Sequence, residues 1–228
     1  MSAVGEGLAR VRDRIARAAE AAGRDPASIR LVAVSKTKPA EAIREAYAAG
    51  QRDFGENYAQ ELAEKAEALR DLPDLRWHFV GHLQSNKAKV VAPLAHLVHS
   101  VDSASLAREL DKRTRAVDPG KKLPVLVEVN VGGEAQKHGA APADVPALLD
   151  AIDASPNLVL RGLMTMPPHD LDATRRAFEA LVALREAHGG AARLPELSMG
   201  MSEDLEIAIA CGATIVRVGT AIFGSRNA

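Results

Sequence analysis

The chain contains very little cysteine, few aromatic residues and no excess of charge of either sign. Cys211 is the only cysteine among 228 residues, which excludes an intrachain disulfide and favours a reducing compartment. The net charge of −1, from 29 basic and 30 acidic residues, provides no strong field that could gather nucleic acid or an anionic membrane. No apolar run approaches the length of a membrane span, and the N-terminus lacks the apolar region of a signal peptide. We therefore expect a cytoplasmic protein without nucleic-acid or membrane partners.

Short apolar segments alternate with amphipathic helical stripes along the whole chain, without a long linker. The expected strands cover residues 31–36, 52–55, 77–81, 97–101, 124–131, 158–163, 196–199 and 214–218. Strict alternation of this kind predicts an α/β fold with parallel strands. Eight units favour one (β/α)8 barrel domain over residues 1–228, rather than an open doubly wound sheet. That alternative also lacks a G-x-G-x-x-G motif after its first strand.

Two further expectations concern helices. An additional N-terminal helix, with its apolar stripe at Val4, Leu8, Val11 and Ile15, precedes the first strand, and we expect it to cover one end of the barrel. Pro93 is expected to end the short helix after the third strand, because proline disrupts the backbone hydrogen bonding of a helix interior.

Lys36 follows the unbroken apolar run from Leu31 to Val34, which is typical of a strand covered on both faces. In a (β/α)8 barrel the carboxyl ends of the strands carry the chemistry. A lysine at such an end can be partly desolvated, and its neutral amine is then a nucleophile for a Schiff base. The alternative is an ordinary solvated lysine, as most lysines are.

Glycine and hydroxyl residues follow the seventh and eighth strands, where barrels often bind phosphate. Gly200 and Gly219 allow backbone N–H groups to approach an anion, and Ser202 and Thr220 add hydroxyl donors. The alternative is that Ser202 only caps a helix and the glycines only turn the chain. The acidic pair at 203–204 suits such a first helical turn, and would oppose a phosphate if it pointed toward it.

Arg217 lies inside the apolar sequence Val216-Arg217-Val218, and a buried charge is costly unless it is paired. One interpretation directs the guanidinium toward an aspartate or glutamate at the barrel end. The other gives it a ligand to contact.

Five segments stand out in order along the chain, at residues 34–39, 54–58, 77–87, 197–202 and 217–224. Taken together, they resemble the pyridoxal phosphate homeostasis proteins, which are single-domain relatives of bacterial alanine racemase. This resemblance implies a fold-type III barrel that holds pyridoxal 5′-phosphate as an internal aldimine on Lys36. The segment 130–139 also resembles the loop of this family after strand five, with Glu134 and Lys137 at its marked positions.

The resemblance also implies how the cofactor is held. The implied cofactor-binding residues are Lys36 as the Schiff-base lysine, Asn57 near the ring, Ser202, Gly219 and Thr220 at the phosphate, and Arg217 at the pyridine nitrogen. An arginine stays protonated, so it donates to an unprotonated ring nitrogen, and a neutral pyridine is a poorer electron sink than a pyridinium.

We therefore expect a cofactor-homeostasis protein without efficient catalysis of its own, with pyridoxal-phosphate-dependent apoenzymes as candidate partners. A racemase is the alternative function, and weak racemase-like activity stays open. The racemases add a second, β-rich domain, for which no room follows Gly219, and this favours a monomer. A Schiff-base aldolase acting on a phosphorylated sugar is a third hypothesis, disfavoured by the resemblance.

The remaining candidates have ordinary interpretations. His78 and His82 lack a third ligand, so we expect no metal site. Lys38, Lys137 and His138 are expected to be solvated, although each could lie at the mouth of the pocket. The sulfur-containing and aromatic residues Cys211, Met199, Met201 and Tyr58 are expected to pack in the core, with both methionines and Tyr58 as possible cofactor contacts.

Overall fold

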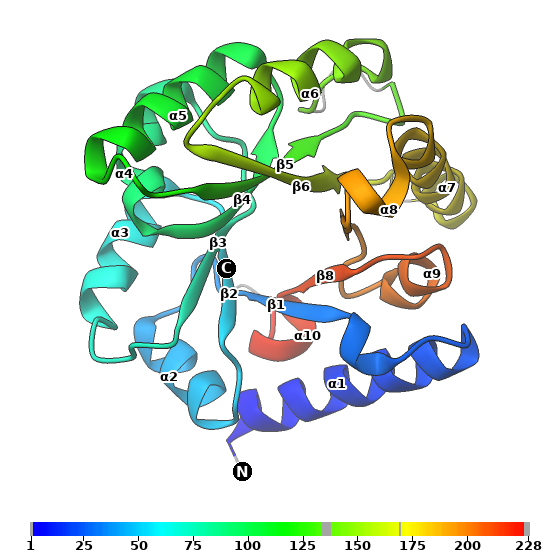
Figure 1. The fold of residues 1–228 in the computed structure, drawn as a ribbon. Coiled ribbons are helices and arrows are strands. Elements are labelled where there is room, and N and C mark those ends of the chain that lie inside the picture. Colours follow the sequence, from blue (N-terminus) through cyan, green and yellow to red (C-terminus); the bar gives the residue numbers. More distant parts are fainter. Residues whose placement is uncertain (1, 134–137, 169, 226–228) are drawn as a thin grey trace.

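A closed barrel of parallel strands forms the centre of the molecule (Figure 1). The computed structural model describes residues 2–133, 138–168 and 170–225. The strands pair in sequence order, and β8 closes the barrel by pairing with β1. They are β1 Arg30–Val34, β2 Asp53–Glu56, β3 Arg76–Phe79, β4 Ala95–Val101, β5 Leu123–Glu128, β6 Leu158–Met164, β7 Glu196–Ser198 and β8 Ile215–Val218. The predicted (β/α)8 architecture is confirmed.

The α-helices form a ring outside the barrel (Figure 1). They are α1 Ala3–Ala21, α2 Ala40–Ala48, α3 Ala59–Ala68, α4 Ala88–Leu94, α5 Ala104–Val117, α6 Val145–Asp153, α7 Leu171–Ala187, α8 Gly190–Arg193, α9 Leu205–Ala210 and α10 Thr220–Phe223. Short 3-10 turns lie at Pro26–Ser28, Ser85–Lys87 and Pro142–Asp144. Within the described ranges, no helix is both long and apolar enough to cross a lipid bilayer.

The N-terminal helix α1 lies along the side of the barrel, so its expected place over a barrel end is wrong. It contacts α2, α9 and α10, and Figure 1 shows it between α2 and α9 in the ring. The helix after β8 has only four residues, and α1 therefore fills the last position of the ring. Gly7 permits the close approach, because a Cβ there would lie 2.6 Å from the carbonyl oxygen of Ile222.

Two element boundaries differ from the sequence prediction. Pro93 does not end its helix but lies inside α4, which continues to Leu94. A proline this close to the C-terminus disturbs only the last turn, so the helix can accommodate it. The first strand ends at Val34 rather than Lys36, because a turn with the Lys38 amide donating to the Ser35 carbonyl begins there.

The core has an outer and an inner part. The outer part lies between strands and helices, whereas a smaller apolar cluster consists of Val32, Leu97, Leu126, Met164 and Ile215. These five alternate along their strands with residues of the outer core, so they face the barrel interior. Buried polar residues also lie on the strands of the barrel. Among them are His78 on β3, His99 on β4, Ser198 on β7 and Arg217 on β8.

Candidate functional site

A cavity of about 770 Å³ lies at the carboxyl ends of the strands, where the barrel fold places its chemistry. All six residues expected at the cofactor line it: Lys36, Asn57, Ser202, Arg217, Gly219 and Thr220. They come from segments after β1, β2 and β7, from β8, and from the turn into α10. The structure therefore brings into one place residues that are separated by up to 184 positions in the sequence, from Lys36 to Thr220. The volume falls within the range of about 300–1,000 Å³ that small-ligand sites occupy.

Lys36 lies in the turn two residues beyond β1. Its neighbour Thr37 has a φ of 62°, a left-handed conformation that is unfavourable for a β-branched residue. The Thr37 amide donates to Glu61 Oε1 at 2.5 Å, and the Ser35 amide donates to the Gly55 carbonyl at 2.9 Å. Contacts on both sides thus fix the backbone that carries Lys36, at the cost of local strain.

A buried ionic cluster lies beneath this turn. The Lys65 ammonium donates to the Ser35 carbonyl at 2.6 Å and to Oε1 of both Glu56 and Glu61 at 2.7 Å. The Ser35 hydroxyl donates to the same Glu56 oxygen at 2.6 Å. Burial raises the pKa of Glu56, against the opposing effect of the Lys65 charge and the hydrogen bonds from Lys65 and Ser35. We call Lys65, Glu56 and Glu61 the lysine clamp, because together they hold the residues on both sides of Lys36.

Sequence reasoning missed the lysine clamp. The expected second strand ends at residue 55, whereas β2 includes Glu56, and no expectation concerned Lys65, which lies on α3. One signal was present, since Glu56 ends the short sequence Asp53-Phe54-Gly55-Glu56, in which every residue is buried. A charged residue inside a buried strand requires a partner.

Ser202, Gly219 and Thr220 lie on the two loops expected to bind phosphate. The Ser202 hydroxyl does not cap α9, which begins only at Leu205. Instead it accepts from the Ala221 amide in the first turn of α10 at 3.4 Å and joins the two loops. A Cβ on Gly219 would lie 3.0 Å from the Val34 carbonyl oxygen, so the close approach of these segments favours glycine.

The neighbouring acids also line the cavity, as Glu203 and Asp204 both belong to its wall. The carboxylate of Asp204 accepts from the Met201 amide at 2.5 Å, so it is engaged by its own loop. Met201 contributes to the cavity wall, whereas Met199 is fully buried in the outer core.

Arg217 is only 3% exposed, and its guanidinium extends through the barrel interior to the cavity wall. Nη1 donates to Ser198 Oγ at 2.7 Å, and Nη2 donates to the Thr165 carbonyl at 3.0 Å. Within the described residues it forms no ion pair within 4.0 Å, so the interpretation as an acid-paired arginine is not supported there. Burial lowers the pKa of Arg217 to about 10, with Glu128 and Asp204 opposing that shift, and the group stays protonated at neutral pH.

Asn57 follows β2 directly and faces the cavity. Its Oδ1 is buried and has no hydrogen-bond partner among the described residues. A buried amide oxygen without a partner is costly in a folded protein, and a ligand donor would relieve that cost. A Cβ at Gly81 would lie 2.2 Å from the Asn57 carbonyl oxygen, so the glycine in the third resembling segment permits this placement.

The other candidates have varied environments. Lys38 lines the cavity and donates to the Ser225 carbonyl at 2.8 Å. Tyr58 is 57% exposed, so the expectation that it packs in the core is wrong. His82 lies 3.5 Å from Asp102 and stacks on the ring of His138 with 3.7 Å between centroids.

Among residues 2–133, 138–168 and 170–225, no three histidine, cysteine, aspartate or glutamate side chains are arranged so that they could hold a metal ion. Cys211 is half-buried and packs against the outer core. The expectations for Glu134 and Lys137 lie outside the described residues.

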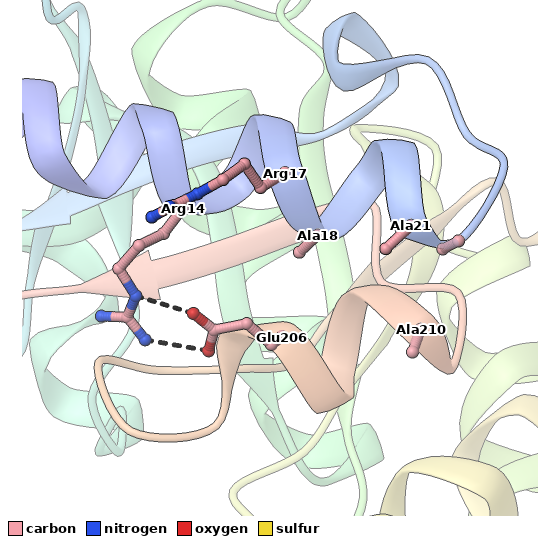
Figure 2. Close-up of a pocket in the computed structure, with 7 residues that line it drawn as sticks. Arg14, Arg17, Ala18, Ala21, Glu206 and Ala210 are labelled. Atoms are coloured by element: carbon pink, nitrogen blue, oxygen red, sulfur yellow. Dashed lines mark hydrogen bonds and ion pairs between the residues drawn. The ribbon is translucent and has the colours of Figure 1, made fainter.

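A second cavity, of about 420 Å³, lies between α1 and α9 (Figure 2). Its charged lining is already paired, since Arg14 forms a two-pronged ion pair with Glu206 at 2.7 and 2.9 Å, and Arg17 pairs with Asp13 at 2.9 Å. Arg14 also donates to the Ser202 carbonyl at 2.9 Å. This region therefore ties the N-terminal helix to the Ser202 loop, and offers no free polar group comparable to Asn57.

Comparison with known proteins places residues 7–227 within the family model described as alanine racemase, N-terminal domain. A pyridoxal phosphate homeostasis protein of Pseudomonas aeruginosa is 53% identical over 232 residues, which cover 100% of this chain and 97% of that protein. One from Escherichia coli is 44% identical over 234 residues, covering 100% and 98% of the two chains.

A solved structure of PipY from Synechococcus elongatus, with PLP bound, superposes with a TM-score of 0.81. It is 41% identical, and the match covers 97% of this chain and 100% of that one.

Proposed function

The chain belongs to the pyridoxal phosphate homeostasis protein family, and from that premise we propose that it binds pyridoxal 5′-phosphate in the central cavity. Its role is cofactor homeostasis in the cytoplasm. The observation that carries the proposal is the convergence of Lys36, Arg217 and the two phosphate-type loops on one cavity. The bound cofactor supplies an aldehyde that condenses with amines and a ring that can withdraw electrons.

The donor set of the cavity fits this group. An amine, a hydroxyl and glycine-rich backbone are the groups that hold a phosphorylated aldehyde, and the cavity supplies them from Lys36, Ser202 and Gly219. The buried Oδ1 of Asn57, which has no partner among the described residues, would accept a hydrogen bond from the ligand. Arg217 offers a guanidinium held at the cavity wall by Ser198 and Thr165.

Each of these residues then has a distinct task. Lys36 Nζ would hold the aldehyde of the cofactor, and the lysine clamp fixes the backbone on both sides of Lys36. Ser202, Gly219 and Thr220 would hold the phosphate. Arg217 stays protonated and would face the ring nitrogen as a hydrogen-bond donor, which would leave that nitrogen without a proton and the ring a weaker electron sink.

The electronic role of Arg217 supports a protein that holds its cofactor without efficient catalysis, and apoenzymes that need pyridoxal phosphate are its candidate partners. A monomer is the proposed state. Racemisation of an amino acid is the second candidate function, because the family model that matches residues 7–227 is that of an alanine racemase domain.

The test is cofactor binding by two matched lysine variants. Purified protein is titrated with pyridoxal 5′-phosphate, and the visible absorption band of the bound form is recorded for the parent, Lys36→Met and Lys38→Met. Lys38 lies two positions away and lines the same cavity, so it controls for charge and volume. We expect loss of the band in Lys36→Met only. A parent protein without the band, or an unchanged Lys36→Met, would overturn the proposal.

Catalysis is tested separately with L-alanine. The loaded protein is incubated with the amino acid, and the optical rotation is followed. Rotation that persists supports a homeostasis role, whereas its loss at the turnover of an ordinary enzyme, about 1–1,000 s⁻¹, would establish a racemase.

A further inference from the structure

Arg217 is one end of a chain of hydrogen bonds that crosses the barrel interior. Ser198 Oγ lies 2.7 Å from Arg217 Nη1 and 2.8 Å from His99 Nδ1. His99 Nε2 lies 2.9 Å from His78 Nδ1, and His78 Nε2 lies 2.9 Å from Asp53 Oδ1. We call Ser198, His99, His78 and Asp53 the barrel relay.

The relay spans the barrel from one end to the other. Asp53 is the first residue of β2 and binds Arg76, the first residue of β3, through two hydrogen bonds of 2.9 and 2.7 Å. Ser198 is the last residue of β7, beside the cofactor cavity. The two histidines between these ends are at most 2% exposed, so water does not compete for their hydrogen bonds.

The two ends of the relay determine its direction. A guanidinium can only donate, so Ser198 accepts from Arg217 and has its own O–H for His99 Nδ1. A carboxylate can only accept, so His78 presents N–H at Nε2 to Asp53. If both imidazoles are neutral, each carries its proton on Nε2, and every donor points from Arg217 toward Asp53.

A relay whose donors point the other way is excluded by the hydrogen-bonding capacity of its groups and by the burial of the histidines. If His99 donated from Nδ1, the Ser198 hydroxyl would lose its acceptor in the relay, and His78 would need protons on both nitrogens. That would place an imidazolium in a fully buried site. Burial lowers the pKa of His78, and burial followed by repulsion from His78 holds the pKa of His99 well below its usual range. For Asp53, burial acts to raise the pKa, but hydrogen bonds from His78 and Arg76 hold it well below its usual range.

We propose that Ser198, His99, His78 and Asp53 are positioning residues for Arg217, acting as one unidirectional chain with both imidazoles neutral and protonated on Nε2. The relay holds Nη1 through Ser198, while Nη2 donates to the Thr165 carbonyl and the Met166 sulfur, and together these contacts fix the plane of the guanidinium. The relay also keeps a hydroxyl oxygen, rather than a carboxylate, in contact with Nη1. This inference rests on the proposed function for its consequence at the cofactor, but not for the structure of the relay itself.

The first experiment examines the relay in the protein without cofactor. Nitrogen-15 NMR of histidine-labelled protein near neutral pH reports which ring nitrogen carries the proton. We expect the two buried histidines to give Nε2–H signals that exchange slowly with water. A proton on Nδ1, or a doubly protonated ring, at either His78 or His99 would overturn the proposal. Because no cofactor is present, this result does not depend on whether the chain binds pyridoxal phosphate.

The second experiment cuts the relay beside Arg217. Ser198→Ala removes the hydroxyl, whereas Ser100→Ala removes a hydroxyl that is equally buried but has no partner among the described residues. We expect Ser198→Ala to relax the tautomer of His99 toward a mixture. It should also weaken pyridoxal phosphate binding about tenfold, the lower end of what a hydrogen bond to a charged group contributes.

Ser100→Ala is the control for the second experiment. Ser100→Ala should leave both the histidine signals and the dissociation constant unchanged, and thermal unfolding of both variants identifies a loss of folding. If Ser198→Ala and Ser100→Ala bind the cofactor with the same dissociation constant, and the His99 signal is the same in both variants, Ser198 does not position Arg217. If the parent itself binds no cofactor, the proposed function fails while the histidine signals still decide the relay.

Discussion

The lysine clamp gives the sharpest prediction about the backbone that carries Lys36. Lys65→Met keeps the length of the side chain and removes its ammonium, which donates to the Ser35 carbonyl, Glu56 and Glu61. All three donors of that ammonium are in use, so the substitution removes three interactions at once. The Glu56 carboxylate is fully buried, and its Oε1 accepts from Lys65 and from the Ser35 hydroxyl. In the variant, only the Ser35 hydroxyl of these two donors would remain.

The size of the effect follows from this burial. Removing one partner of a buried ion pair costs about 3–5 kcal/mol, and because methionine fills the volume we expect about 3 kcal/mol. For a chain of this length that corresponds to a fall in melting temperature of roughly 6–12 °C. Lys89→Met is the matched control, since Lys89 is exposed on α4, and we expect it to change stability by less than about 0.5 kcal/mol.

The loss should depend on pH. The pKa of Glu56 is raised by burial in the parent, and without the Lys65 charge it rises further. The folded variant then binds a proton that the unfolded chain, with its lower pKa, does not hold. Its stability therefore recovers as the pH falls toward the unfolded pKa. Adding Glu56→Gln to Lys65→Met should restore part of the loss at neutral pH, because the amide carries no charge.

The assay is urea unfolding near neutral pH and at about pH 5. The free energy difference between Lys65→Met and the parent should be smaller at the lower pH. A loss below about 1 kcal/mol, or one of equal size at both values, would refute the assignment of Lys65 as the counter-charge of Glu56. Cofactor retention is measured on the same samples, and we expect it to weaken with the loosened Ser35 carbonyl.

Two further substitutions test the phosphate loops. Ser202→Ala should weaken cofactor retention about threefold to tenfold, since it removes a hydroxyl proposed to donate to the phosphate, and dialysis followed by absorbance measures the loss. Unchanged retention would limit Ser202 to its bond with the Ala221 amide, which joins the two loops. Gly219→Ala should weaken phosphate binding more strongly, because the added Cβ would lie 3.0 Å from the Val34 carbonyl and must displace a strand end. Calorimetric titration with pyridoxal phosphate measures this effect, and a parent-like dissociation constant would show that the loop absorbs the methyl group without moving.

The barrel, Lys36, Arg217 and the glycine and hydroxyl residues of the two loops could be predicted from local sequence patterns, whereas Asn57 was implied only by the family resemblance. Apolar runs such as Leu31–Val34 identify strands, and the fold rule that strand ends carry chemistry then groups Lys36 with Arg217. The sequence itself shows an arginine inside the apolar run that forms β8. Because burying an unpaired charge is unfavourable, this placement indicates a functional residue.

The supporting residues could not be predicted, because their partners are distant along the chain. His99 and Ser198 are 99 positions apart, and no local pattern relates them. The spacing of His78 and His82 indicates at most a metal ligand, because the partners of His78 within the barrel depend on which side chains face the interior. The position of α1 beside the barrel depends on α10, which has only four residues and leaves a place in the ring of helices for α1. The sequence of α1 alone does not show that this place exists.

The most direct test of the central claim locates the lysine that holds the cofactor. The protein loaded with pyridoxal 5′-phosphate is reduced with borohydride, which makes the bond between lysine and pyridoxyl group permanent, and the modified peptide is identified by mass spectrometry. Lys36 and Lys38 line the same cavity, so the fragmentation must separate these two positions. The account predicts a pyridoxyl group on Lys36 alone. A label on Lys38 or on another lysine, or no label at all, would contradict it.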